Sequence, residues 1–251
     1  MIDPTTKKFP EGTTFDIILS IYEFDTKLSH ILFEFLTKIE IALRARLVVA
    51  LSNYGDALIL SDPSKFDNKE LYWKNQSAIA SEIARSNDVF INHNFYKHDG
   101  AIPIWAVVEV MSFGTLSKVI KTLKTGNGAV YSNLASYYQY KTSKGNTATP
   151  KKEMLSSWVQ AASFMRNICA HNSRIYNRSF TTRPKLISTD AINPTPKFNG
   201  VYQIILAMKY LRPSDDSWKV FVSELCSLFN TFSNFVTPKK LHFPNDWEKH
   251  F

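Results

Sequence analysis

The residues from 164 to 178, FMRNICAHNSRIYNR, form one of the densest sets of side chains in this sequence that could carry out chemistry. Three arginines, three asparagines and a histidine fall within these fifteen residues. Histidine titrates near neutral pH and can act as a general base or acid. Arginine presents a planar fork of donors that matches a phosphate. Together these residue types suit the cleavage of a phosphodiester bond.

RNA is the substrate class that this set of side chains fits best. His171 would remove the proton of a ribose 2′-OH, and Arg166 would stabilise the negative charge that builds on the phosphorane. An asparagine can fix the histidine tautomer or donate a hydrogen bond to an oxyanion. Because RNA carries its nucleophile internally, this chemistry requires no metal. The sequence also contains no CxxC or HExxH pattern of the kind that binds zinc.

The spacing of these residues predicts a helix from about 151 to 177. On such a helix Asn167, His171, Arg174 and Arg178 would form a single polar stripe. Arg166 lies five residues before His171, about 140° around the helix. The two side chains therefore converge only if the helix distorts or if another subunit supplies the complementary half.

A structural role for the same residues is the alternative. A single helical histidine is often a hydrogen-bonded structural residue. Arg174 and Arg178 near a helix C-terminus would complement the helix dipole without any further function.

Helical periodicity dominates the rest of the chain and predicts an all-α fold in one domain, residues 1–251. The first helical segment, 15–53, is long enough to be one helix or two, and Tyr54-Gly55 is a natural stop. Asp67 and Glu70 resemble a capping box. The remaining expected helices are 67–85, 103–124 with an interruption at Gly114, 129–140, 200–211 and 215–236, the last with Val220, Val222, Leu225, Leu228, Phe229 and Phe232 facing inward.

Polar and proline-containing segments separate these helices. Residues 141–150 are expected to form a loop, and residues 178–200, with three prolines, a long irregular connection. Within that connection, 184–188 could form a short strand.

Composition limits the possible classes of protein. The chain has 251 residues, of which 44% are hydrophobic, so it is not disordered. No glycine-rich nucleotide-binding string is present, and two cysteines cannot form a disulfide framework. There is no signal-peptide core and no apolar run long enough to span a membrane, so we expect a cytoplasmic protein. The net charge of +8 favours a polyanionic partner such as nucleic acid.

The string RNICAHNSRIYNR resembles the signature of the Abi-like (AbiD/AbiF-type) abortive-infection family, which belongs to the HEPN ribonuclease group. The mark of that group is an arginine, a polar residue, several variable residues and a histidine, here Arg166, Asn167 and His171. Two further stretches are similar to family elements: 34–55, with Glu40 and Arg44, and 103–123, with Trp105, Glu109, Phe113 and Gly114. The resemblance spans roughly residues 15–180.

The resemblance implies a HEPN-like helical bundle, here with additional C-terminal helices at 200–236. It also implies a metal-independent, cofactor-free endoribonuclease that acts as a toxin in phage defence or in a toxin–antitoxin pair. Arg166 and His171 would be catalytic, and Asn167 would orient the pair or the phosphate. Active sites in the HEPN group commonly form where two such motifs meet across a dimer. This chain has one motif, so we expect a homodimer.

Members of the family are also thought to be restrained by a partner, in some cases a small structured RNA. Basic and hydrogen-bonding side chains around the motif would bind such an RNA or the substrate. The candidates are Lys151, Lys152, Asn172, Arg174, Tyr176 and Arg178. The alternative is a solvated basic surface, with the tyrosine packed in the core instead of stacked on a base.

Other residues of the resembling stretches have structural explanations. Trp105 and Gly114 are expected to reflect core packing and a tight helix crossing. Glu109 could pair with an arginine near the site. Glu40 and Arg44 could form an exposed ion pair four residues apart or tie the first helix to the motif helix.

Two other readings of the whole protein stay open. The motif could grip a partner RNA without cutting it, or the chain could be a structural helical protein with a buried His171. Replacing His171 with alanine would abolish cleavage in an enzyme, only weaken binding in an RNA-binding module, and lower stability in a structural protein.

Overall fold

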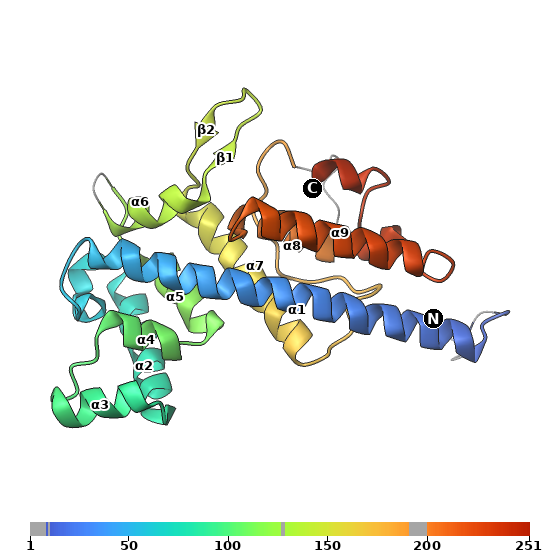
Figure 1. Ribbon diagram of the computed structural model, residues 1–251. Helices are drawn as coiled ribbons and strands as arrows, with labels where there is room; N and C mark the ends of the chain where they lie inside the picture. The colour runs from blue at the N-terminus through green and yellow to red at the C-terminus, as the bar shows by residue number, and fades with distance from the viewer. Residues whose placement is uncertain (1–8, 10, 127–128, 191–199) are drawn as a thin grey trace.

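The computed structural model describes residues 9, 11–126, 129–190 and 200–251, and the predicted all-α class is confirmed: the chain is mostly helical (Figure 1). The α-helices are α1 (Phe15–Ser52), α2 (Lys69–Arg85), α3 (Val89–Lys97), α4 (Ile104–Val110), α5 (Phe113–Thr122), α6 (Val130–Ala135), α7 (Lys152–Ala170), α8 (Val201–Leu211) and α9 (Asp215–Thr231). Short 3-10 turns cover Ile59–Ser61, Pro63–Lys65, Ser136–Tyr138, Pro238–Leu241 and Trp247–His250.

The first segment forms one helix, not two. α1 begins after Thr14, whose hydroxyl accepts a hydrogen bond from the Ile17 amide, and it ends at Ser52, next to the predicted stop. Its apolar side chains, among them Leu28, Leu36 and Leu43, are buried along its length. Helix α7 packs against α1, α5 and α8, and α9 packs along α1. α1 thus runs across the whole molecule, with the motif helix crossing it (Figure 1).

Helix α2 begins one residue later than a capping box at Asp67 requires. The cap is Asn68, whose side-chain oxygen accepts a hydrogen bond from the Leu71 amide 2.9 Å away. The Asp67 carboxylate instead binds the Lys152 ammonium at 2.6 Å and the Thr125 hydroxyl at 3.1 Å. The predicted capping box is therefore wrong, because tertiary partners occupy the Asp67 side chain.

The segment 103–124 is interrupted as predicted, but not at Gly114. α4 ends at Val110, and Ser112 caps α5 by accepting a hydrogen bond from the Thr115 amide at 3.2 Å. Gly114 lies in the first turn of α5, and a Cβ atom there would stay 4.0 Å from the Ser163 hydroxyl. The expected tight crossing at Gly114 is thus wrong. Trp105, expected in the core, is 58% exposed.

The motif helix is shorter than predicted. α7 ends at Ala170, and Asn172 follows with a φ of 47°, in the left-handed region. The Asn172 amide donates to the Cys169 carbonyl at 2.9 Å, and the Ser173 amide donates to the Ile168 carbonyl at 3.0 Å. This pair of bonds is a Schellman motif, which closes a helix. The helix predicted to continue to residue 177 is therefore cut at the histidine.

The segment predicted as a loop at 141–150 includes a small antiparallel hairpin. Its strands are β1 (Tyr140–Lys141) and β2 (Thr147–Ala148), with Tyr140 opposite Ala148. The connection that follows α7 is irregular from 178 to 190, with no strand at 184–188, and the rest of the predicted connection, 191–199, lies outside the described residues.

The C-terminal helices lie near their predicted positions. α9 ends at Thr231, before the predicted 236, and its buried side chains include Leu225, Leu228 and Phe229. Val220 is 54% exposed, so its predicted inward orientation is wrong. Phe24 of α1 contacts Phe229 and the following Phe232, with ring centroids 5.5 and 5.8 Å apart. These aromatic contacts join the C-terminal helices to the same core as the motif helix.

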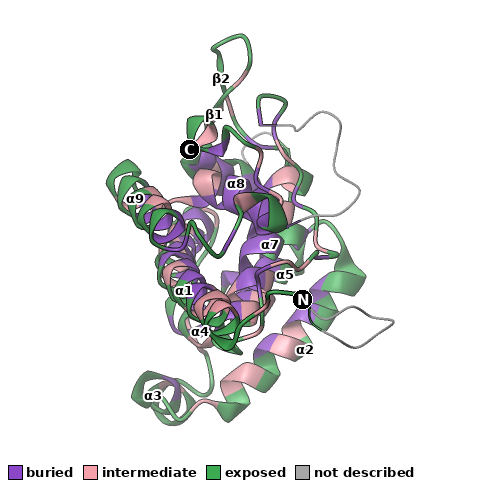
Figure 2. Cartoon of the chain, turned by 90° about the vertical axis from the view of Figure 1, so that its right-hand side faces the viewer, coloured by how far each residue is buried: buried purple, intermediate pink, exposed green. Residues whose placement is uncertain are grey.

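The distribution of buried residues agrees with this packing of the helices. Buried residues concentrate on the inner faces of α1, α7 and α8, while α3 and the β1–β2 hairpin are largely exposed (Figure 2). Among the described helices, none is both long enough and apolar enough to cross a membrane.

Candidate functional site

Arg166 on α7 is held by a carboxylate on α1. Its Nε lies 3.2 Å from Oε2 of Glu40, and its Nη2 lies 3.0 Å from the same oxygen and 3.2 Å from Oε1. This two-point geometry is the arrangement in which an arginine and a carboxylate interact most strongly. The Arg166 guanidinium also lies 5.9 Å from the centroid of the Phe113 ring.

Glu40 also binds a second arginine, Arg44, at 2.6 Å. Arg44 donates to the backbone carbonyls of Val108, Glu109 and Met111, at the turn between α4 and α5. Of the two explanations for the Glu40–Arg44 pair, the one in which it ties the first helix to the motif helix is confirmed. The exposed-pair explanation is wrong, because both side chains are largely buried. The Glu109 carboxylate, which is exposed, pairs with no described arginine.

The triad of Arg166, Glu40 and Arg44 carries a net charge of one positive unit, from two guanidinium groups and one carboxylate. The side chains of Arg166, Glu40 and Arg44 are 25%, 11% and 16% exposed. Charges this far from water require partners, and the shared carboxylate supplies one to each arginine. Arg166 therefore has a fixed orientation and keeps an uncompensated share of positive charge.

Asn167 lies next to this arginine. Its side-chain oxygen is 3.4 Å from Nη1 of Arg166, the guanidinium nitrogen that Glu40 leaves free. The structure thus brings the side chains of Arg166 and Asn167 together.

His171 is the residue that closes α7. Its backbone amide donates to the Asn167 carbonyl at 3.1 Å, while its side chain is exposed and its imidazole contacts no described residue through a hydrogen bond or ion pair. The alternative of a buried structural histidine is therefore wrong.

The predicted polar stripe does not exist, because the helix ends before it is complete. Past Asn172, the chain leaves the helix axis, and Arg174 lies in the following turn. Arg178 donates to the Arg174 carbonyl at 3.2 Å and lies 5.4 Å from the centroid of the Phe180 ring. The structure thus places these two arginines on the irregular segment after α7.

Tyr176 and Lys152 have structural partners. Tyr176 is buried, with its ring edge against Phe24 and its hydroxyl accepting a hydrogen bond from the Thr237 amide at 3.2 Å. Its ring is covered by protein, so the packing alternative holds and stacking on a base does not. Lys152 pairs with Asp67 and donates to the Leu123 carbonyl.

Lys151 and Lys152 also lie far from the histidine. They occupy the N-terminal end of α7, whose 19 residues end next to His171. At about 1.5 Å per residue, the helix separates the two ends by roughly 28 Å. The lysines therefore cannot contact the same phosphate as His171 within one chain.

Asp25 of α1 positions the segment after the motif helix. Sequence reasoning missed this residue, and the only signal for it was an acidic side chain within a helical segment that has an apolar period. Its carboxylate accepts hydrogen bonds from the amides of Ile175 and Tyr176, the latter at 2.6 Å. Burial raises the pKa of the Asp25 carboxyl, and these two amides and the charge of Arg174 oppose the increase. One turn further on, Ser29 donates to the Cys169 carbonyl at 3.4 Å.

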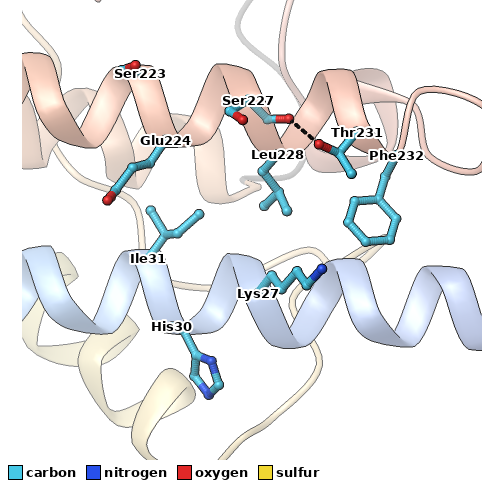
Figure 3. Close-up of a pocket in the computed structure, with 9 residues that line it drawn as sticks. All are labelled: Lys27, His30, Ile31, Ser223, Glu224, Ser227, Leu228, Thr231 and Phe232. Carbon is cyan, nitrogen blue, oxygen red and sulfur yellow. Dashed lines mark hydrogen bonds between the residues drawn. The ribbon is translucent and has the colours of Figure 1, made fainter.

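A groove of about 560 Å³ lies elsewhere, between α1 and α9 (Figure 3). Its lining mixes charges and hydroxyls, including Lys27, Glu224 and Thr231, whose hydroxyl donates to the Ser227 carbonyl. The His30 side chain on its edge points away from α9. None of the candidate residues on or after α7 lines this groove. In the described residues no group of three or more histidines, cysteines and carboxylates could hold a metal ion.

Comparison with known proteins gives one result. A family model described as Abi-like protein matches residues 2–177, which include α1, the α4–α5 pair, α7 and the motif up to Asn177. A search of curated proteins and a search of solved structures both find no significant match. The family match covers most of the chain and includes the Glu40–Arg166 pair and His171. The chain therefore belongs to the Abi-like protein family.

Proposed function

We propose that this protein is a metal-independent endoribonuclease of the HEPN type and acts as a toxin in phage defence. Its family indicates abortive infection, a phage-defence response. The observation that carries the proposal is that Glu40 holds the Arg166 guanidinium in place five residues before His171, whose exposed imidazole has no hydrogen-bond or ion-pair partner among the described residues.

The proposed reaction uses the chemistry of these two side chains. His171 takes the proton from a ribose 2′-OH, and the O2′ oxygen attacks the adjacent phosphorus. Arg166 donates to the phosphorane oxygens through Nη1, the nitrogen left free by Glu40. The bond from phosphorus to O5′ then breaks, O5′ takes up a proton, and the products are a 2′,3′-cyclic phosphate and a 5′-hydroxyl. Asn167 orients the guanidinium or the phosphate.

A homodimer is part of the proposal. Arg166 turns toward Glu40 on α1, while His171 leaves the helix at its end, so the two groups do not form a closed pair within one chain. A second copy would place its own histidine or arginine opposite the first, as in the HEPN group. Size-exclusion chromatography with light scattering measures this directly, and a monomer that cleaves RNA would contradict it.

RNA would contact the basic residues that remain accessible. Arg174, Arg178 and Asn172 lie on the segment after His171, and Lys151 is exposed at the far end of α7. Lys152 and Tyr176 already contact other residues of the fold, so they would support the RNA-binding surface without contacting RNA directly. The same surface would bind a restraining antitoxin RNA of the AbiD/AbiF type.

A non-catalytic RNA-binding module is the second candidate. The net charge of +8 supports RNA binding in this candidate as it does in the enzyme, because phosphate contacts supply affinity whether or not cleavage follows.

Cleavage of RNA by the purified protein in EDTA tests the proposal. Wild type is compared with His171→Ala and Arg166→Ala, after any co-purified RNA has been removed and folding has been checked by circular dichroism. His93→Ala, an exposed histidine on α3, is the matched control. Loss of cleavage in the first two variants and not in the control supports the enzyme. RNA that is bound but left intact by wild type overturns catalysis in favour of the binding module.

A further inference from the structure

A recess of about 370 Å³, lined by both polar and apolar groups, lies between α5 and α7, beside the candidate site. Three serines with buried side chains line it: Ser117 of α5 and Ser156 and Ser163 of α7. Gln160 of α7, which is exposed, adds an amide. Gly114 lines the recess as well, and the absence of a side chain there keeps it open toward Ser163. Hydroxyl and amide groups both donate and accept, so the recess can bind a polar ligand.

One of these hydroxyls has no partner. Ser156 is only 7% exposed, and its hydroxyl oxygen is shielded from solvent. This oxygen makes no hydrogen bond with a described residue. A buried polar atom without a partner costs stability, and such atoms are rare in folded proteins. Because Ser156 lines the recess, a ligand bound there is a candidate partner for this hydroxyl.

Two lysines on α5 make the recess electropositive. Lys118 and Lys121 both line it, both are exposed, and neither pairs with a carboxylate in the part of the chain that the structure describes. Residues three apart on a helix share a face, so both ammonium groups can reach the same ligand. Two uncompensated charges beside buried hydroxyls suit a ligand with a phosphate and a polar body.

The lining of the recess reaches to within one helical turn of Arg166 along α7. Ser163 lies one helical turn before Arg166 on α7, and Gly114 follows Phe113, whose ring lies under the Arg166 guanidinium. On the other side, Phe164 of the lining packs against Phe180, and the Arg178 guanidinium lies over the Phe180 ring. A chain of ligand atoms that leaves Arg166 along α7 would therefore enter the recess.

We propose that this recess is a nucleotide subsite of the ribonuclease, which holds one nucleotide of a single-stranded RNA next to the phosphate at Arg166. The inference rests on the proposed function and adds the substrate class. Lys118 and Lys121 bind the phosphate, while the serine hydroxyls and Gln160 form hydrogen bonds with the ribose and the base edge. Single-stranded RNA is favoured because its nucleotides can turn out of the strand and offer their base edges to hydrogen-bonding side chains.

Fluorescence anisotropy with a labelled single-stranded oligoribonucleotide tests the subsite, in a His171→Ala background that leaves the RNA uncut. Lys118→Ala/Lys121→Ala removes both charges, and Lys74→Ala/Lys97→Ala, on α2 and α3, removes the same charge from exposed lysines elsewhere. We expect the first variant to weaken Kd about tenfold and the control to change it less than about twofold. The slope of log Kd against log salt should fall by about 1.4 for two lost phosphate contacts on a single strand.

Ser156→Ala gives a second readout that a purely structural serine would not produce. Removing an unpartnered buried hydroxyl should leave the melting temperature unchanged or raise it, while RNA affinity falls. Lower stability with unchanged RNA affinity would overturn this part of the inference.

The outcomes separate the subsite from the enzyme. RNA cleavage by wild type, with wild-type Kd in both the lysine and serine variants, overturns the subsite and leaves the ribonuclease intact. Equal losses of RNA affinity in the lysine variant and its control also overturn the subsite. They would show that RNA is attracted by the positive charge of the whole protein and not by this recess. Lysine-dependent binding without cleavage supports the subsite and overturns the ribonuclease. Absence of RNA binding overturns both.

Discussion

The Glu40 carboxylate and the Arg166 guanidinium form a two-point ion pair between α1 and α7, with Nη2 and Oε2 3.0 Å apart. The same carboxylate holds Arg44, which in turn binds the backbone where α4 ends and α5 begins. One acidic side chain thus fixes three segments that come from distant parts of the sequence. It also sets the direction in which the candidate catalytic arginine presents its free nitrogen.

Glu40→Gln should lower the free energy of unfolding by about 2 kcal/mol. Breaking a fully buried pair costs roughly 3–5 kcal/mol, and the partial exposure of Arg166 reduces that cost. Urea denaturation measures the change. Glu34→Gln on the same helix is the control, because its pair with Lys38 is exposed and should contribute less than about 1 kcal/mol. Equal effects of the two substitutions would show that the triad does not stabilise the helix crossing.

His171→Ala should change the free energy of unfolding by less than about 0.5 kcal/mol, because the side chain is exposed and without a partner among the described residues. Thermal and urea denaturation of the variant beside wild type measure this. The expected combination is full stability with loss of RNA cleavage. A destabilisation of several kcal/mol would instead indicate that His171 has a structural role.

Asp25→Ala should destabilise the fold by about 2 kcal/mol, because the amides of Ile175 and Tyr176 lose their acceptor in a partly buried position. Asp25→Asn keeps an acceptor oxygen and should cost less. Urea denaturation of both variants provides the comparison. If alanine and asparagine cost the same, these two hydrogen bonds do not hold the segment after α7.

Asp25 also predicts a pH dependence. Its pKa in the folded protein is raised above the ordinary 3.8, so the folded state binds the proton more tightly than the unfolded state does. The stabilisation from this group is therefore fully present below pH 3.8 and is lost as the pH rises through the folded-state pKa. Unfolding free energies of wild type and Asp25→Asn should diverge over that window. Parallel curves would contradict the raised pKa.

Asn172→Val should destabilise the protein by about 1–2 kcal/mol, because a β-branched residue resists the left-handed backbone that ends α7. Asn172→Gly should be neutral or stabilising. Asn53→Val, at the end of α1 where φ is −73°, is the control and should cost less. Differential scanning calorimetry of the three variants tests whether the left-handed residue stops the helix.

Much of this protein could be predicted from the sequence by local reasoning. The period of apolar residues predicted α1 and α8, because a helix that buries one face repeats its apolar positions every three or four residues. Gly114 predicted an interruption within 103–124, which the structure places at residues 111–112. The motif at Arg166 and His171 was recognisable for the same local reason: its residue types and spacing are written in a single short string. The Abi-like family that it suggested agrees with the family match.

Only the tertiary structure decided how those residues are used. Glu40 and Arg166 are 126 residues apart, and no local pattern joins them. The same is true of Asp25, which turns the chain after Asn172 and so removes the stripe that an uninterrupted helix would have made. Trp105 lies on an exposed face although its type predicted burial. Periodicity specifies which residues share a helix face, but the neighbour that covers that face is chosen by contacts between distant segments, and these fixed the environment of the candidate site.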